Sequence, residues 1–290
     1  MRIDLMAGAT LSAALPAHNP QPVILVFDSG LGGLTVLEQV RRARPDAAYL
    51  YVADDAAFPY GALSEPQLVA RMIAVMERLL ARHAPDLVVI ACNTASTVVL
   101  PALRQRFVTP FVGVVPPIKP AAALTRSRLV SLLATPGTVA RSYTHDLVRS
   151  YAADCAVTLV GSKNLARYAE AEMAGAPVSD AAILAEIAPC FVETEGRRTD
   201  VVCLSCTHYP LLLTRFERLA PWPVTWIDPA PAIARRVVQL LGERPQRAPD
   251  APAARAVFTG GTGLTPALGR SLEQRGLCET QVEAMPLVLS

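Results

Sequence analysis

The sequence has little charge, few cysteines and no long apolar run, and each shortage excludes a class of protein. Charged residues make up only 18% of the 290 residues, whereas hydrophobic residues make up 52%. A disordered chain needs the opposite balance. The net charge of +2 gives no electrostatic reason to expect binding to nucleic acid or to an anionic membrane. No apolar run approaches the roughly 18 residues of a membrane helix, so we expect a globular protein with a sizeable core.

The six cysteines are too few and too irregularly spaced for a disulfide framework. We interpret them as reduced thiols of a cytoplasmic protein, which leaves a few of them available for chemistry. Residues 1–21 are expected to form a flexible leader. Asp4, Gly8 and Thr10 interrupt the apolar stretch that a secretory signal would need, so we do not expect secretion.

Short apolar runs alternate along the chain with segments whose apolar residues recur at helical spacing. Leu34, Leu37 and Val40, for example, follow the apolar run 23–27. Strands that alternate with helices indicate an α/β fold, in which a parallel sheet has helices on both faces. The predicted strands are residues 23–27, 49–53, 87–91, 111–115, 129–134, 155–160, 201–204 and 224–227.

The two halves of the chain repeat one chemical pattern. Each half begins with a strand, turn and helix rich in small residues, at 28–33 and at 135–138. Each then has a strand that ends in a cysteine followed by small polar residues, at Cys92 and at Cys206. We therefore predict two similar doubly wound parallel-sheet lobes, with the active site between them at the carboxyl ends of the strands. The expected boundaries place residues 22–115 and 229–290 in lobe A and residues 116–228 in lobe B.

Two motifs that suggest other chemistry are weak. The glycine-rich turn at 30–33 follows a strand, with Asp54 about 20 residues further on, but Thr35 occupies the position of the third glycine of a dinucleotide-binding fingerprint. The backbone amides of such a turn still suit a carboxylate. Cys203 and Cys206 form a single CxxC without a second pair, which is little support for a metal or redox site. Cys203 is expected to pack in the core.

Cys92 and Cys206 differ from the other cysteines because each ends an apolar strand and precedes a helix. A thiol at the amino end of a helix is expected to have a lowered pKa. Their neighbours, which include Asn93 and Thr207, are of residue types that bind polar ligands. A structural role for either cysteine alone stays open, but the duplicated setting favours a role in chemistry.

Four segments, in this order, resemble the glutamate racemase family: residues 27–35 (FDSGLGGLT), 58–61 (FPYG), 89–96 (VIACNTAS) and 205–211 (SCTHYPL). The resemblance extends from about Pro22 to the C-terminal region. Two more segments, 113–119 (GVVPPIK) and 138–145 (TVARSYTH), resemble the branch of that family that is activated by the peptidoglycan precursor UDP-N-acetylmuramoyl-L-alanine. A leader before Pro22 also fits that branch.

The resemblance implies racemisation of glutamate by two bases that act on opposite faces of the α-carbon, without pyridoxal phosphate, another cofactor or a metal. Cys92 is then the group that acts on D-glutamate, and Cys206 the group that acts on L-glutamate. Asp28 and His208 hold or tune the thiols, with Glu170 assisting. The implied substrate-binding residues are Asp28, Ser29, Tyr60, Gly61, Asn93, Thr94, Thr135, Thr138, Thr207 and His208.

The same resemblance implies a cytoplasmic enzyme that supplies D-glutamate for peptidoglycan, with an activator site at the end of a strand where both lobes can sense it. Lys119 and Arg104 offer cationic donors for a diphosphate or carboxylate. The expected activator residues are Arg104, Gly113, Val114, Val115, Pro116, Pro117, Ile118 and Lys119. Ser205, Pro117 and Pro229 depart from the usual pattern of the family, and these departures bear on regulation and substrate fit rather than on the reaction class.

Other interpretations stay open. The chain can be a two-cysteine racemase for aspartate or hydantoin, although the Thr-His pair after the second cysteine favours glutamate. A non-catalytic role as an inhibitor of DNA gyrase, and the choice between monomer and homodimer, also stay open, although no basic stripe supports a direct contact with DNA. Purely structural roles are open for several site residues: helix caps for Asp28, Thr135 and Thr138, a satisfied histidine for His208, an exposed helix residue for Glu170 and a simple turn for 60–61.

Overall fold

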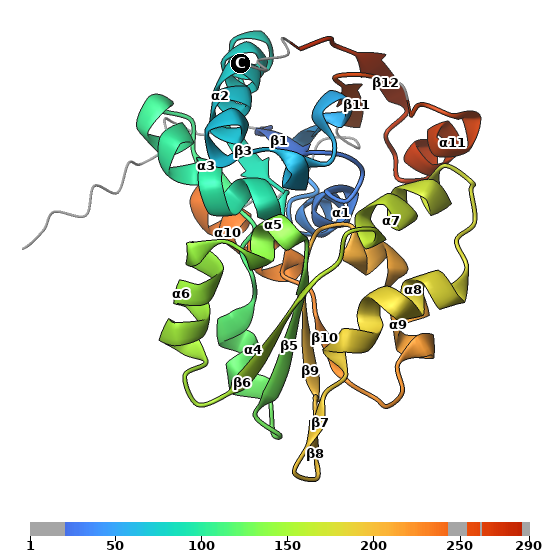
Figure 1. The fold of residues 1–290 in the computed structure, drawn as a ribbon. Coiled ribbons are helices and arrows are strands. Elements are labelled where there is room, and N and C mark those ends of the chain that lie inside the picture. Colours follow the sequence, from blue (N-terminus) through green and yellow to red (C-terminus); the bar gives the residue numbers. More distant parts are fainter. Residues whose placement is uncertain (1–20, 243–253, 262, 286–290) are drawn as a thin grey trace, which may run out of the picture.

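The computed structural model describes residues 21–242, 254–261 and 263–285. Two parallel β-sheets, each covered by helices on both faces, form an upper and a lower lobe in Figure 1. The predicted class, an α/β fold with two doubly wound parallel-sheet lobes, is confirmed. The leader predicted at 1–21 lies outside the described residues, apart from Gln21.

Lobe A contains six parallel strands in the order β12-β11-β2-β1-β3-β4. Its elements are β1 (Val23–Asp28), α1 (Leu34–Ala43), β2 (Ala48–Ala53), η1 (Asp55–Ala57), η2 (Tyr60–Ala62), α2 (Glu65–His83), β3 (Leu87–Ile90), α3 (Asn93–Arg106), β4 (Phe111–Gly113), α10 (Ala230–Leu241), β11 (Ala254–Phe258), α11 (Pro266–Gln274) and β12 (Glu279–Val282). Successive side chains of a strand point to opposite faces. Ile24 and Val26 therefore pack with α1, α10 and α11, whereas Leu25 and Phe27 pack with α2 and α3.

Lobe B contains four parallel strands in the order β10-β9-β5-β6. Its elements are α4 (Ile118–Leu124), β5 (Leu129–Ala134), α5 (Pro136–Val139), α6 (Ser142–Tyr151), β6 (Ala156–Gly161), α7 (Leu165–Met173), α8 (Asp180–Ile187), η3 (Ala188–Cys190), the hairpin β7 (Glu193–Thr194) and β8 (Arg197–Arg198), β9 (Val201–Ser205), η4 (Tyr209–Leu212), α9 (Leu213–Leu219) and β10 (Thr225–Ile227). Leu132 and Cys203 pack with α4 and α6, whereas Leu133 and Leu204 pack with α7, α8 and α9. The expected core position of Cys203 is confirmed.

The predicted strands are all present, with two kinds of difference. β4 ends at Gly113 rather than at 115, because Pro116 and Pro117 have no amide hydrogen to donate and the chain leaves the sheet to begin α4. The hairpin β7–β8 and the C-terminal elements β11, α11 and β12 are additional to the predicted ones. β12 is a mostly polar edge strand with the sequence Glu-Thr-Gln-Val, so it lacks the apolar run by which the other strands were found.

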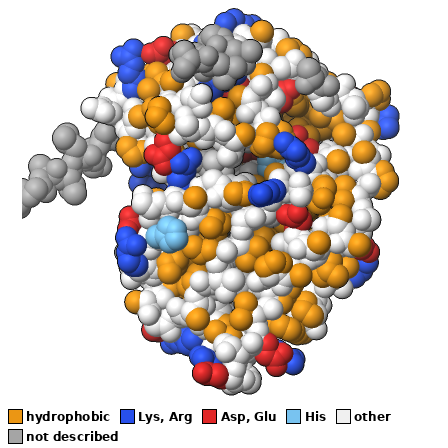
Figure 2. Space-filling view, in the orientation of Figure 1, with side chains coloured by type: hydrophobic (Ala, Val, Ile, Leu, Met, Phe, Trp, Pro, Cys, Tyr) orange, Lys and Arg blue, Asp and Glu red, His pale blue; other side chains and the backbone are white. Residues whose placement is uncertain are grey.

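The predicted lobe boundaries at 115/116 and 228/229 fall in the connections between β4 and α4 and between β10 and α10; they stay a prediction. On the face of the molecule in Figure 2, basic and acidic side chains are interspersed, and no continuous stripe of one sign crosses it. No helix within the described residues has the length and apolarity that crossing a membrane requires.

Gly33, which leads from the turn after β1 into α1, has no room for a side chain. A Cβ atom there would lie 2.7 Å from Asp28 Cβ and 3.1 Å from Ala91 Cβ. We expect Gly33→Ala to lower the free energy of unfolding by about 1–3 kcal/mol, the usual cost of overpacking, as measured by urea denaturation. Gly269→Ala in α11 is the control, because nothing lies within 4 Å of its Cβ position. Equal effects of the two substitutions would contradict the argument.

Candidate active site

A small cavity lies where the carboxyl ends of strands from both lobes meet. Cys92 comes after β3, Thr135 after β5 and Cys206 after β9, as expected for a ligand site in parallel α/β sheets. The cavity has a volume of about 20 Å³. Its lining residues are Ser29, Phe58, Pro59, Tyr60, Gly61, Cys92, Asn93, Thr94, Thr135, Ala166, Cys206, Thr207 and His208.

Most residues predicted for catalysis and substrate binding line this cavity. Asp28, Thr138 and Glu170 lie behind the lining, and each forms a hydrogen bond with a residue of the lining. Residues 58–59 and Ala166 also line the cavity and were not predicted from the sequence. The first two stand in the FPYG motif, which was a usable signal, whereas an alanine on α7 carries no chemical signal.

The two thiols enter the cavity from different lobes, and each has a polar neighbour. Cys92 Sγ lies 3.8 Å from Ser29 Oγ, and Cys206 Sγ lies 3.7 Å from His208 Nδ1. Both cysteines are buried. The cavity therefore presents two separate sulfur groups, one with a hydroxyl beside it and one with an imidazole beside it.

The expectation of a lowered thiol pKa is wrong for Cys92. Burial raises the pKa of this thiol far above its ordinary value, and the nearby carboxylate of Asp28 raises it further. Cys92 does stand at the amino end of α3, where the amide of Ala95 lowers the pKa, but this effect is smaller. The Cys92 thiol is therefore protonated at neutral pH.

Asp28 is fully buried and connects the two lobes. Its carboxylate accepts hydrogen bonds from the backbone amides of Gly30 and Gly33, at 3.2 and 3.1 Å, and from the Thr207 hydroxyl at 3.3 Å. Burial raises the pKa of Asp28, and the nearby His208 opposes this rise. The amides of the glycine-rich turn thus bind a carboxylate of the protein itself.

His208 is held between a thiol and a carboxylate. Its Nε2 lies 2.8 Å from Glu170 Oε1, on the side of the ring away from Cys206. Burial by itself lowers the pKa of His208, but the hydrogen bonds with Cys206 and Glu170 outweigh burial and raise the pKa well above its usual range. Glu170 also accepts a hydrogen bond from the Leu31 backbone amide, at 2.8 Å. The interpretation of Glu170 as an exposed helix residue is therefore wrong, because only 23% of its side chain is exposed.

Three hydroxyls from both lobes form a cluster beside the thiols. Thr94 Oγ1 lies 3.0 Å from Thr135 Oγ1 and 3.2 Å from Thr138 Oγ1. Asn93 is buried, and neither its side-chain oxygen nor its nitrogen has a hydrogen-bond partner among the described residues. Among the residues that the structure describes, no Arg or Lys lines the cavity. Hydroxyls, amides and Asn93 are thus the groups that can bind a polar ligand here.

The residues predicted for an activator lie elsewhere and are not all accessible. Arg104 and Gly113 line a separate hollow of about 610 Å³ between α3, β4 and α10, together with Arg236. Lys119 does not line it; its ammonium group lies 5.5 Å from the centre of the Tyr151 ring. Val115 is half-buried, and the remaining predicted residues are buried: Val114, Pro116, Pro117 and Ile118.

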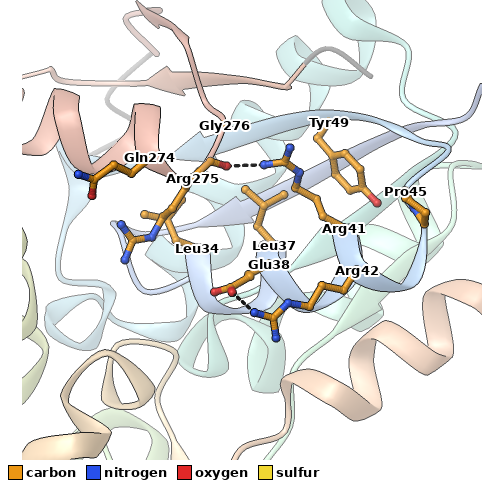
Figure 3. Close-up of a pocket in the computed structure, with 10 residues that line it drawn as sticks. All are labelled: Leu34, Leu37, Glu38, Arg41, Arg42, Pro45, Tyr49, Gln274, Arg275 and Gly276. Carbon is orange, nitrogen blue, oxygen red and sulfur yellow. Dashed lines mark hydrogen bonds and ion pairs between the residues drawn. The ribbon is translucent and has the colours of Figure 1, made fainter. Parts of the chain in front are cut away.

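A larger hollow of about 800 Å³ lies along α1, between this helix and the residues that follow α11, and no predicted site residue lines it. Figure 3 shows Arg41 directed at the turn before β12, where it donates to the Arg275 carbonyl, and Arg42 paired with Glu38 on the surface of α1. The described cations at this hollow are thus already engaged within the protein.

Comparisons with known proteins place the chain among racemases. The chain matches the model of the Asp/Glu/Hydantoin racemase family over residues 34–237. It is 54% identical over 245 residues to glutamate racemase of Brucella anthropi (84% of this chain, 87% of the relative) and 56% identical over 259 residues to that of Mesorhizobium japonicum (88% and 97%). The fold is similar to the crystal structure of Escherichia coli glutamate racemase in complex with L-glutamate and the activator UDP-MurNAc-ala, with a TM-score of 0.82, 41% identity, and coverage of 92% of this chain and 100% of that chain.

The charge of Asp28 should be visible in the reactivity of Cys92. Because that charge raises the thiol pKa, Asp28→Asn should shift the midpoint of Cys92 alkylation by iodoacetamide to lower pH, as followed by mass spectrometry of the Cys92 peptide. Asp200→Asn is the control, because this carboxylate binds Thr125 and the amide of Ser127 instead. An unchanged or higher midpoint in Asp28→Asn would show that Asp28 does not disfavour the thiolate.

Proposed function

Because the chain belongs to the Asp/Glu/hydantoin racemase family, we propose that it interconverts L- and D-glutamate without a cofactor, with Cys92 and Cys206 as the acid–base groups. The observation that carries the proposal is that one thiol from each lobe lines the same cavity. Racemisation removes the α-proton from one face and returns a proton to the other. A single base tends to return it to the same face, so two monoprotic groups are needed.

The proton balance is the same in both directions. From D-glutamate, the Cys92 thiolate takes the α-proton, and the Cys206 thiol donates its proton to the opposite face, which leaves Cys206 as the thiolate. From L-glutamate, Cys206 is the base and Cys92 the acid. Each turnover therefore exchanges the protonation states of the two sulfurs, and solvent exchange resets them.

His208 and Glu170 support the Cys206 thiolate in this proposal. Hydrogen bonding raises the pKa of His208 well above its usual range, and its Nδ1, 3.7 Å from the Cys206 sulfur, is placed to donate a hydrogen bond to it. Glu170 neutralises the imidazolium and fixes the ring. This arrangement is that of an activated cysteine oriented by a histidine and a third group.

No cation of the described residues is paired with Cys92 in this way, and burial disfavours its thiolate. The ammonium group of a bound amino acid supplies positive charge inside the cavity, which lowers the pKa of a nearby thiol. We therefore assign part of the activation of Cys92 to the substrate itself. Ser29, 3.8 Å from the sulfur, is placed to donate to the thiolate.

The substrate carboxylates are held by hydroxyls and amides in this proposal, with the three-threonine cluster and Asn93 as the main donors. A cavity of about 20 Å³ is only slightly larger than the roughly 10–15 Å³ that one water needs. Glutamate has ten non-hydrogen atoms, so the lobes must move apart to admit it.

We further propose that the product is used for peptidoglycan in the cytoplasm and that a peptidoglycan precursor regulates the enzyme. The support is the similarity to the E. coli enzyme, whose structure holds UDP-MurNAc-ala, and the hollow that Arg104, Gly113 and Arg236 line. The hollow lies where β4 leads into the connection to lobe B. A ligand that prefers the active arrangement of the lobes would increase its population.

The reaction and the two thiols are tested together by circular dichroism. Cys92→Ala and Cys206→Ala should each slow racemisation of D- and L-glutamate by about 100-fold or more, the usual contribution of an acid–base group. Wild-type product formed in deuterium oxide should carry deuterium at the α-carbon, because the incoming proton comes from a thiol that exchanges with solvent.

Cys278→Ala is the matched control, because Cys278 is exposed and does not line the cavity; its rate should equal that of the wild type. Near-wild-type turnover by either cavity variant, or retention of protium at the α-carbon, would contradict the two-base mechanism. Faster turnover of aspartate or of a hydantoin than of glutamate would instead replace the proposed substrate.

Activation predicts a low basal rate that rises with UDP-N-acetylmuramoyl-L-alanine. Arg104→Met should require about tenfold more of this precursor, the effect of losing one charge-assisted hydrogen bond, and should reach a similar rate at saturation. Arg106→Met, on the same helix but paired with Glu77, is the control. Equal basal and precursor-saturated rates in the wild type would refute activation.

A further inference from the structure

A buried ion pair lies directly behind the cavity wall, outside the group of residues that the proposed mechanism uses. Asp54, the first residue after β2, and Arg71, on α2, are 0% and 2% exposed. Arg71 Nε donates to Asp54 Oδ2 at 2.9 Å, and Arg71 Nη2 donates to the other carboxylate oxygen. Thr259, after β11, donates its hydroxyl to Asp54 at 2.7 Å. Residues from three segments of lobe A thus meet at one carboxylate.

This carboxylate holds a residue of the cavity lining. The Tyr60 hydroxyl donates to Asp54 Oδ2 at 2.5 Å, and its ring stacks on Phe27 with 6.5 Å between the ring centres. Burial and the charge of Asp54 raise the pKa of Tyr60 well above its usual range, so the hydroxyl remains a donor. The hydroxyl is therefore used inside the protein rather than on a ligand.

The turn that Tyr60 begins is the part that meets the cavity and lobe B. Gly61 lines the cavity and, having no side chain, does so with its backbone. A Cβ at Gly137 would lie 3.5 Å from Gly61 Cα, so this turn also packs against α5 of lobe B. Any shift of Tyr60 would move a wall of the cavity and a contact between the lobes.

We propose that Asp54 and Arg71 are positioning residues of the racemase, which act through the Tyr60 hydroxyl to hold the turn η2 (Tyr60–Ala62) in the geometry that binds substrate. The proposal rests on the proposed function. A buried ion pair by itself is weak support for stability, because desolvation offsets the attraction. What it supplies here is a charged acceptor with a fixed direction, held by two donors of a rigid guanidinium.

The test replaces the ion pair by a neutral pair in the full chain. Asp54→Asn/Arg71→Met leaves no unpaired buried charge, so the variant is expected to fold. The control is Arg44→Met/Asp46→Asn, because Arg44 and Asp46 form a buried ion pair of the same lobe, 2% and 1% exposed, that does not line the cavity. Tyr60→Phe removes only the hydroxyl and should reproduce the effect of the first variant.

We expect Asp54→Asn/Arg71→Met to raise KM for both glutamate enantiomers about tenfold, because a misplaced turn weakens substrate binding by about the free energy of one hydrogen bond. The change in kcat should be smaller, and the pH profile should not change. Amide hydrogen exchange should become faster in the peptide that covers 54–63 in this variant and in Tyr60→Phe, but not in the control. Equal KM values for the two double variants would overturn the proposal.

The exchange measurement separates this proposal from the proposed function. If wild-type protein did not racemise glutamate, the proposed function would fail. Faster amide exchange confined to 54–63 in the variants would still support the positioning of Tyr60 by Asp54 and Arg71. Unchanged amide exchange at 54–63 in the Asp54→Asn/Arg71→Met variant would overturn this positioning role, whatever the activity of the variant. A shifted pH profile in Tyr60→Phe would also overturn it, because the hydroxyl would then take part in proton transfer.

Discussion

The site depends on a close contact between the glycine-rich turn of lobe A and the segment after β9 in lobe B. A Cβ atom on Gly32 would lie 2.6 Å from the His208 backbone nitrogen and 2.7 Å from Thr207 Oγ1, so only glycine permits this approach. The approach brings Thr207 to the Asp28 carboxylate and Glu170 to the Leu31 amide. Without it, the two cysteines would end separate sheets rather than line one cavity.

A consequence of this contact is that the site has little positive charge of its own. The amides of the turn, which alone would suit an anionic ligand, are occupied by Asp28 and Glu170. His208 is the cation beside the Cys206 thiol, and its proton depends on the partners that surround it. The anionic substrate that we propose is therefore bound by neutral hydroxyls and amides, in a closed space where hydrogen bonds are strong because the dielectric constant is low.

Local patterns made much of the fold predictable. Buried parallel strands are continuous apolar runs, so β1, β5 and β9 were found nearly to the residue. The repeated cysteine-ending strand also predicted that both thiols would reach one site. The polar strand β12 was not predicted, because an edge strand needs no continuous apolar run. The shift of the Cys92 thiol pKa was predicted in the wrong direction, because the local sequence shows the position at a helix end but not the depth of burial.

The sequence by itself determined the order of most strands and helices, the chemical identity of the cavity residues and the glycines that let the turn approach. Only the tertiary structure decided which charges face which groups. Asp54 has no local pattern that links it to Arg71, Tyr60 and Thr259, and Asp28 meets Thr207 from a position 179 residues away. The physical reason is that burial and hydrogen bonding depend on what packs across the interior, and segments distant in the chain supply those partners.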